Sequence, residues 1–425
     1  MKIRKIIAAA ALAVCLVCAC LPVSASAAGY ALGDNVTGVF DPDTGSLVIS
    51  GSGPMYDFDT ESGHVQAEYS RVVIEPGVTY VGTHFFSPDD QIDELVLPDA
   101  AITINEEAFS GSVIDRVIFP QSATDAAQYD FGDENAPFGN AVVHNLDLGG
   151  LGGFPNGFRF GYGDNYDLVS LIVGANTTAI PDNTCNCFGM LESLTLPHGL
   201  LTIGAGAFES CEMLQSVRIP DTVTTIGDYA FDYCTNLEHL HLPKDLESIG
   251  EWAFCNCEKL TSVKIPQGAT TIGISAFEDC VNLSQVSVSD SVKTIGINAF
   301  NGTAVQNVHL PAGLTYIHAT SFGTSLTYVC CDTEDCPAVR QFAESAEIEF
   351  RLCSGHAEAP QTPGDVNGDS VLNLKDTVLI RRYLADWDVA IDEDAADVDD
   401  DGEVTLQDVT LMNRYIAGGW NVELN

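Results

Sequence analysis

The chain has 425 residues and is strongly acidic, with 60 Asp and Glu against 17 Lys and Arg and a formal net charge of −43. A surface with so much negative charge repels both nucleic acid and anionic membranes, so the composition excludes both as partners. The sign of the charge names no ligand by itself, and the function has to come from motifs.

Residues 1–28 have the pattern of an export signal. The basic residues Lys2, Arg4 and Lys5 precede a long apolar run, and the small residues at 25–27 form a cleavage site. No later apolar stretch approaches the ~20 residues that a membrane span needs. The sequence therefore predicts a secreted, extracellular protein that is released rather than embedded.

A repeat array occupies residues 29–353. Each period follows the consensus L-x-x-V-x-I-P-x-x-V-T-x-I-G-x-x-A-F-x-x-C, and the Ala-Phe dipeptide recurs 23 residues apart from Phe208 to Phe300. A period in the low twenties predicts a mostly β solenoid of the leucine-rich-repeat kind with roughly a dozen turns, each burying its apolar face only against its neighbours. The buried strand position is predicted at Ile74, Leu97, Phe119, Leu148, Val173, Leu196, Ile219, Leu242, Ile265, Val288 and Leu310.

The two ends of the array carry different patterns. VTGVFDPDTGSLVISGSG (residues 36–53) predicts a hairpin cap, and CPAVRQFAESAEIEF (336–350) predicts a closing helix and strand. Such caps are expected because an open solenoid would expose a strand edge. A Gly-rich stretch over 130–167 disturbs the spacing and predicts an insertion in one or two turns. The array resembles the BspA-like leucine-rich repeats of bacterial surface proteins, through VRIPDTVTTIGDYAFDYCTNL (217–237) and its neighbours.

Eleven of the 14 cysteines remain once the signal is removed. Four of them occupy one repeat position: Cys211, Cys234, Cys257 and Cys280. Disulfides between turns ~4.8 Å apart are possible, but the parallel side chains of a ladder disfavour them, so we expect buried thiols at this position. One disulfide is predicted near the last turn, with metal binding as the alternative, within the group Cys330, Cys331, Cys336 and Cys353.

One column of the strands should face outward, because alternate side chains of a strand point to opposite sides. If Val217 and Ile219 face the core, the column contains no Asp or Glu and comprises Ser193, Thr195, Ser216, Arg218, His239, His241, Ser262, Lys264, Gln285, Ser287, Asn307 and His309. Two explanations stay open. Either Arg218, His239, His241, Lys264 and His309 mark a face that binds a protein or polysaccharide, or stacked strands simply avoid like charges.

A short linker, SGHAEAPQTP (354–363), leads to two acidic twelve-residue loops, DVNGDSVLNLKD from 365 and DVDDDGEVTLQD from 397, each followed by a helix-like apolar run. Calcium requires oxygen ligands at alternate loop positions, a main-chain carbonyl at position 7 and a carboxylate at position 12. The sequence predicts two calcium ions. The ligands would be Asp365, Asn367, Asp369, Val371 (carbonyl), Asn373 and Asp376, then Asp397, Asp399, Asp401, Glu403 (carbonyl) and Asp408.

The module over 364–425 resembles type I dockerins, whose loops open with a GD(V/I)NGDG-like run; residues 364–369 are GDVNGD. The resemblance implies a small all-α domain that attaches a secreted protein to a cohesin domain of a cellulosome-type scaffold. Ser370 stands where the second loop has Gly402, so the second site should bind calcium more tightly. The cohesin type stays open, and the implied contacts are Leu374, Lys375, Arg381, Arg382, Leu406, Gln407, Asn413 and Arg414.

We find no G-x-S-x-G, no H-E-x-x-H and no Cys/His arrangement typical of a catalyst. The sequence therefore predicts a secreted, non-catalytic interaction protein that presents a repeat surface from a cohesin-bearing complex for polysaccharide degradation. One alternative is a glycan-binding component. The other is a hydrolytic component with an unrecognised site in the insertion, supplied by Asp130, Asp133, Glu134, Asp164 and Asp167.

Overall fold

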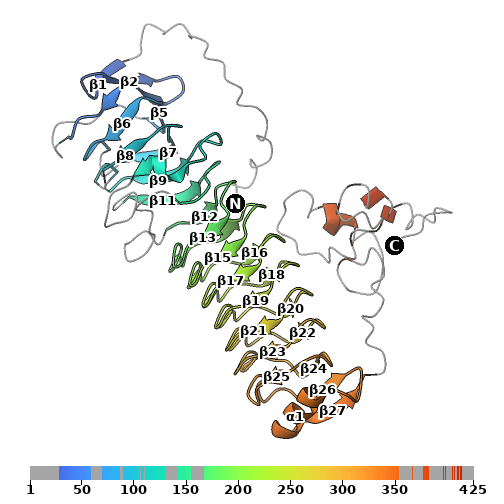
Figure 1. The fold of residues 1–425 in the computed structure, drawn as a ribbon. Helices are drawn as coiled ribbons and strands as arrows, with labels where there is room; N and C mark the ends of the chain where they lie inside the picture. Colours follow the sequence, from blue (N-terminus) through green and yellow to red (C-terminus); the bar gives the residue numbers. More distant parts are fainter. Residues whose placement is uncertain are drawn as a thin grey trace, which may run out of the picture.

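A computed structural model describes residues 28–58, 69–86, 90–105, 107–109, 111–130, 141–154 and 167–353, with isolated positions between 366 and 413. The main body is a β-solenoid in which short parallel strands form two rows along an elongated axis (Figure 1). The predicted linker lies outside the described residues, as does the predicted export signal except for Ala28, the first residue of β1. Within the described part, no helix is long and apolar enough to cross a membrane.

The first row of strands begins with an antiparallel hairpin and continues as parallel strands. Its nine-stranded part contains β1 (Ala28–Ala31), β2 (Val36–Asp41), β3 (Ser46–Gly51), β5 (Arg71–Ile74), β7 (Gln91–Val96), β9 (Val113–Ile118), β11 (Val142–Asp147), β12 (Ser170–Ile172) and β14 (Ser193–Thr195). The row continues through β16 (Ser216–Arg218), β18 (His239–His241), β20 (Ser262–Lys264), β22 (Gln285–Ser287), β24 (Asn307–His309), β26 (Tyr328–Cys331) and β27 (Glu349–Leu352).

The second row supplies the opposite wall of each turn. One sheet contains β4 (Gly53–Pro54), β6 (Val78–Val81), β8 (Ile102–Ile104) and β10 (Tyr129–Asp130), beside the 3-10 turn η1 (Ala126–Gln128). The other contains β13 (Ala179–Ile180), β15 (Thr202–Ile203), β17 (Thr225–Ile226), β19 (Ser248–Ile249), β21 (Thr271–Ile272), β23 (Thr294–Ile295) and β25 (Tyr316–Ile317). Apolar residues of both rows fill the space between them.

The predicted insertion appears as longer turns. Val113 of β9 pairs with Val142 of β11, a spacing of 29 residues, whereas Ser170 pairs with Ser193 at the regular 23. The predicted buried positions are also in the core, but only Ile74 lies within its strand. The other ten, from Leu97 to Leu310, follow their strands directly. The extra chain therefore changes the length of a turn without changing its strand pairing.

Both ends of the solenoid are closed by non-repeating structure, as the sequence predicts. At the N-terminus β2 and β3 pair antiparallel and β3 then pairs parallel with β5. At the C-terminus helix α1 (Pro337–Ser345) precedes β27, which pairs with β26. Pro337 suits the first turn of a helix because that turn needs no amide donor there. Val339, Phe342 and Ala343 of α1 are buried against the last turns.

A ladder of phenylalanine rings runs through the interior. Neighbouring rings stack with centroids 4.9–5.4 Å apart, and the series contains Phe208, Phe231, Phe254, Phe277, Phe300 and Phe322. Phe342 of α1 ends the series, with its ring tilted and 6.0 Å from Phe322. The helix thus supplies the ring that the next turn would otherwise provide.

A second ladder consists of cysteines. Cys211, Cys234, Cys257 and Cys280 are buried free thiols, as expected, and three of them donate to the carbonyl of a Phe one repeat back, such as Cys280 to Phe254 at 3.1 Å. Burial raises the pKa of Cys211 and Cys234, which keeps these thiols protonated. In the turn before the ladder, the small Cys and the large Phe exchange positions. Cys185 lies one period before Phe208, and Phe188 lies one period before Cys211.

Two backbone positions in each repeat have a left-handed conformation. They lie two residues before and two after the ladder Phe, as at Tyr229 and Tyr233, both with φ 57. The conformation costs about 1–2 kcal/mol for a residue with a side chain. It recurs at Trp252, Asn256, Ser275, Asp279 and Asn298. The turn around the ladder Phe has this left-handed conformation in repeat after repeat. The strain is therefore a property of the repeat and does not mark a functional site.

A glycine column lets adjacent turns approach closely. A Cβ placed on any of these glycines would meet backbone of the preceding turn at 2.5–2.7 Å, and the column contains Gly204, Gly227, Gly250, Gly273 and Gly296. Such contacts are shorter than side chains tolerate, so a substitution must push two turns apart. The glycine of the consensus is therefore required by the turn-to-turn distance.

We predict that Gly250→Ala lowers the free energy of unfolding by about 1–3 kcal/mol, because overpacking shifts the backbone of the neighbouring turn. Gly199 offers a matched control, since a Cβ there meets nothing within 4 Å. Gly199→Ala should change stability by no more than about 0.5 kcal/mol. Urea unfolding midpoints of the two variants measure the difference. Equal midpoints would show that the turns separate without cost.

Candidate functional site

The outward strand face is present where the sequence places it. Parallel pairing aligns Ser216 with His239 and Arg218 with His241, and the next pair of strands aligns Lys264 with Ser287. Val217 is buried between its outward neighbours. The five predicted ligand-face residues therefore lie on one side of the first strand row, although Arg218, Lys264 and His309 each have partners of their own.

Carboxylates border this face even though its strands carry none between 193 and 309. The Nε2 atom of His241 lies 3.7 Å from Asp221, and Nε2 of His309 lies 3.6 Å from Asp332. These acids follow the strands in sequence, so the alternation pattern did not include them. Between 193 and 309 the strand column itself thus contains no acid, while acidic side chains lie beside it.

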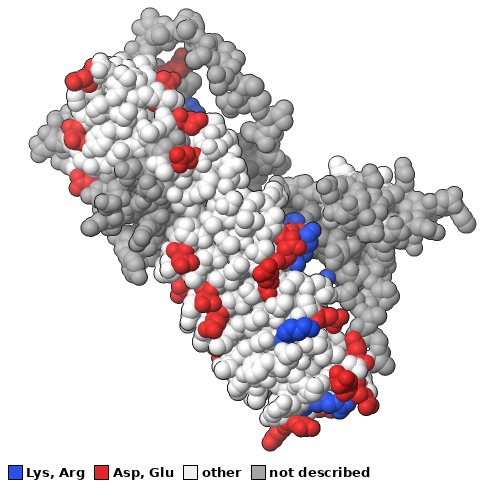
Figure 2. Space-filling view, viewed as in Figure 1, with Lys and Arg blue, Asp and Glu red and all other residues white. Residues whose placement is uncertain are grey.

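Towards the N-terminus the same column contains ion pairs. Arg71 lies 2.7 Å from Glu94, and Arg116 lies 3.0 Å from Asp147, in strands that continue the row. Figure 2 shows acidic side chains in small separate groups, while most of the visible solenoid surface carries no charge. The uncharged and basic stretch between 193 and 309 is thus a local feature of the column.

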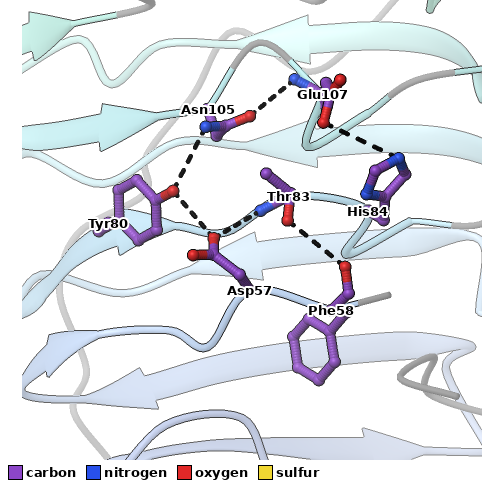
Figure 3. A network of polar contacts seen from close by, with 7 residues as sticks. All are labelled: Asp57, Phe58, Tyr80, Thr83, His84, Asn105 and Glu107. Atoms are coloured by element: carbon purple, nitrogen blue, oxygen red, sulfur yellow. Dashed lines mark hydrogen bonds and ion pairs between the residues drawn. The ribbon is translucent and has the colours of Figure 1, made fainter. Parts of the chain in front are cut away.

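A polar network links three turns near the N-terminal cap, and the sequence analysis did not predict it (Figure 3). Tyr80 donates to Asp57 Oδ1 at 2.9 Å and accepts from the Asn105 amide at 3.3 Å. Burial, together with the Asp57 carboxylate, raises the pKa of Tyr80, so the phenol stays protonated as a donor. His84 and Glu107, 3.9 Å apart, extend the contacts. Each link joins neighbouring turns, which assigns the network to stability.

A second unpredicted feature is a polar column beside the Phe ladder. It occupies the residue after each Phe from Phe208 to Phe300 and begins one turn earlier, after Cys185. Its members are Asn186, Glu209, Asp232, Cys255, Glu278 and Asn301. Asn186 donates to Glu209 at 2.9 Å, and Asn301 donates to Glu278 at 3.0 Å. The Asn residues at both ends of the column thus each donate to one carboxylate oxygen of the neighbouring Glu, whereas the other oxygen of Glu278, Oε2, is buried without a hydrogen-bond partner.

Asp232 is the most deeply buried acid of this column, with 5% of its surface exposed. Its best neighbouring amide, Asn256 Nδ2, is 3.4 Å away. Burial raises the pKa of Asp232 to about 6, and the hydrogen bond from Asn256 opposes the rise only in part. The carboxylate is therefore a cost to the folded state at neutral pH.

The C-terminal module has a small core of its own. Among its described residues, the apolar side chains in contact are Val366, Ile380, Ala396, Val398, Val409 and Met412. Val366 corresponds to Val398 and Ile380 to Met412, each pair separated by the 32-residue spacing of the two loops. Thr377, also buried, is the counterpart of Val409. Equivalent positions of both copies thus meet in one core, as a duplicated module requires.

None of the predicted calcium ligands, the first of which is Asp365 and the last Asp408, is among the described residues. The same is true of Leu374, Lys375, Arg382, Gln407 and Arg414 among the predicted cohesin contacts. The other three are described. Arg381 is exposed, Leu406 is 66% exposed, and the half-buried Asn413 donates to the Val409 carbonyl at 2.7 Å. Leu406 is therefore not part of the small apolar core.

The cysteine group near the last turn contains one disulfide, as predicted, between Cys330 of β26 and Cys353 after β27. Cys331 and Cys336 are buried free thiols on the core side. His309 lies beside the disulfide, with Nδ1 3.8 Å from the sulfur of Cys330.

This architecture is a capped leucine-rich-repeat solenoid joined to a duplicated C-terminal module. Residues 65–136 and 178–303 match the family described as "BspA type Leucine rich repeat region" in six copies, and residues 363–417 match "Dockerin type I domain". The chain is thus a leucine-rich repeat protein of the BspA type with a C-terminal type I dockerin. Among curated proteins none matches the chain.

Three solved structures of leucine-rich repeat proteins are similar to this chain. A leucine-rich repeat protein from Bacteroides ovatus ATCC 8483 is 19% identical over 76% of both chains, with a TM-score of 0.39. One from Eubacterium ventriosum ATCC 27560 is 21% identical over 73% of this chain and 99% of that one, with a TM-score of 0.33. A leucine rich cell surface protein from Faecalibacterium prausnitzii A2-165 is 17% identical over 78% and 96%, with a TM-score of 0.31.

We predict that Asp232→Asn stabilises the solenoid at pH 7.5 by about 1–2 kcal/mol and has little effect at pH 4. The folded-state pKa lies above the unfolded value, so the folded protein binds more protons and its stability falls as pH rises from about 4 to 6. An amide removes this dependence and reproduces what Asn186 and Asn301 already provide. Unfolding midpoints across that pH range measure it; a constant difference between wild type and variant would contradict the burial of charge.

Proposed function

We propose that the protein is a secreted, non-catalytic interaction protein that docks through its calcium-loaded dockerin onto a cohesin-bearing scaffold of a polysaccharide-degrading complex. The observation that carries this proposal is the match of residues 363–417 to the dockerin family, together with a core built from equivalent residues of both loop copies. The cargo carried to the scaffold is the repeat domain. Both recognised parts are of non-catalytic kinds.

Calcium would be required for docking, because the carboxylates of each loop repel one another without an ion and binding free energy becomes folding free energy. We predict that chelation unfolds residues 364–420 and abolishes binding to a panel of cohesin domains, while the solenoid stays folded. Circular dichroism of the isolated module and of the full chain measures the two parts. A module unchanged by chelator would contradict the proposal.

The two loops should differ in strength. Glycine, as at Gly402, suits the sharp turn at position 6, whereas a serine such as Ser370 in the first loop would be strained there. We therefore expect Asp397→Ala to weaken calcium binding and docking by at least about tenfold more than Asp365→Ala. Calorimetry on the two single variants, matched in chemistry and loop position, gives the comparison. The reverse order would show that glycine at the turn does not rank the sites.

The duplicated core supports the proposal of two equivalent partner faces. One would consist of the predicted contacts Leu374, Lys375, Arg381 and Arg382, and the other of Leu406, Gln407, Asn413 and Arg414. If either face can bind, altering one of them to Ala removes one of two modes and raises Kd by only about twofold, while altering both abolishes binding. Titration of a cohesin onto the three variants measures this. A large loss from the first set alone would show a single binding mode.

For the repeat domain we propose that the outward strand face binds a hydroxyl-rich or acidic glycan. The outward-facing strand residues between 193 and 309 include cations and hydroxyls but no acids, unlike the ion-paired strands before them. The combined change of Arg218, His241 and Lys264 to Ser should abolish binding to an acidic polysaccharide such as polygalacturonate, and salt should weaken the wild type. Arg71→Ser, in the same column, is the matched control. Unchanged binding would leave charge avoidance as the explanation.

A hydrolytic cargo is the competing function. Of its proposed carboxylates, Asp130 ends β10 and Asp167 is exposed, while Asp133, Glu134 and Asp164 lie outside the described residues. Incubating the purified chain with plant polysaccharides and measuring released reducing sugar separates the two functions. Release that survives in a preparation lacking other enzymes would favour hydrolysis.

A further inference from the structure

Three metal-binding side chains come together where the first strand row ends. His309 of β24, Cys330 of β26 and Cys353 after β27 offer ligand atoms that all lie within 4.8 Å of one another. They come from three successive strands, because His309 pairs with Cys330 and the Cys353 amide donates to the Cys331 carbonyl. Within the described residues this is the one group of three such side chains with that spacing.

Two thiolates and an imidazole are a donor set for a soft or borderline cation, above all Zn²⁺. The Cα atoms of Cys330 and Cys353 are 5.6 Å apart, close enough for both sulfurs to reach one ion at about 2.3 Å. Cys330 is buried and held in a strand, while Cys353 is half-buried at the end of the last one. The sulfur of Cys353 is therefore the one that has room to move.

The orientation of His309 supports a metal rather than a chance cluster. Its Nδ1 faces the sulfur of Cys330 at 3.8 Å, and its Nε2 faces Asp332 Oδ2 at 3.6 Å. A metal-binding imidazole usually donates its second N–H to a carboxylate, which fixes the tautomer and makes the other nitrogen a better ligand. The side chains of His309 and Asp332 are 24% and 49% exposed, so a fourth position is open to water.

His241 shows that a histidine beside a carboxylate is not sufficient to form such a group of metal ligands. It occupies the same column three strands earlier and lies 3.7 Å from Asp221, yet its neighbours in the column are Arg218 and Lys264. Only at His309 does the column continue into a cysteine. Among the described residues, the cap therefore combines a His–Asp pair with two cysteine sulfurs beside the same histidine, a combination that His241 does not have.

We propose that reduction of the Cys330–Cys353 disulfide converts the C-terminal cap into a Zn²⁺ site, with the two sulfurs and His309 Nδ1 as ligands and Asp332 as the positioning residue. A dithiol reductant supplies two electrons and two protons, giving two cysteine thiols and the oxidised reductant. Zn²⁺ then replaces the two thiol protons. Either the disulfide or the ion joins β26 to the segment after β27, so the cap stays closed in both redox states.

The test uses the full chain, reduced, freed of reductant and saturated with Ca²⁺ so that the acidic loops are filled. Titration with Co²⁺ should give sulfur-to-cobalt charge transfer and tetrahedral ligand-field bands at one ion per chain, reversed by Zn²⁺. Cys353→Ser should abolish the charge transfer and His309→Ala should weaken binding at least about tenfold. Asp332→Asn should weaken it by about 10–100-fold while keeping the spectrum.

His241→Ala is the matched control and should leave the titration unchanged. The oxidised chain should show no charge transfer. A spectrum that survives in Cys353→Ser, or its absence from the reduced wild type, overturns the proposal. A further measurement needs no variant: Zn²⁺ should protect Cys330 and Cys353 of the reduced chain from alkylation, as located by peptide mass spectrometry. Protection of Cys331 and Cys336 instead would also overturn it.

Discussion

The separation of adjacent turns is the constraint on which the rest of the solenoid depends. Backbones of adjacent turns must approach closely enough for strand pairing in both rows. A single Cβ in the glycine column would prevent this approach, since a Cβ on Gly250 would clash with the backbone of Gly227. Once the turns are this close, every interior side chain lies against its own equivalent. Stacked Phe rings and a ladder of cysteines follow from that spacing, because identical residues at one period must pack on themselves.

The same constraint makes the two ends special. A turn in the middle has a partner on each side, whereas the first and last turns must be covered by structure that is not a repeat. The hairpin of β2 and β3 covers one end, and Phe342 of α1 completes the ring ladder at the other. Residues that are not bound by the repeat pattern are therefore free to take other roles. The disulfide, His309 and Asp332 all lie at such an end.

The two copies in the dockerin are arranged differently from the repeats of the solenoid. The solenoid stacks its copies in one direction, so equivalent residues form columns that continue from turn to turn. The C-terminal module has only two copies, and Val366 with Val398 and Ile380 with Met412 meet in one closed core. This pairing of equivalent core residues is the physical basis for the proposal that either copy can face a partner. The solenoid instead has one extended row of outward strand residues.

The sequence by itself determined the solenoid, its period, the hairpin and helix at its ends, the buried thiols and the loops typical of calcium binding. These depend on residues that repeat at fixed spacing or on local turn and cap preferences, and Phe208 to Phe300 or residues 36–53 carry that information without any partner. Only the tertiary structure decided which side chains face each other across different turns. Asp332 follows His309 by 23 residues and Tyr80 follows Asp57 by 23, so the period places each pair in adjacent turns, while Asp221 precedes His241 by 20. Whether these side chains meet depends on how far each turn is displaced from the next. The burial that raises the pKa of Asp232 has the same origin, because the neighbouring turns, and not residues adjacent in sequence, remove its water.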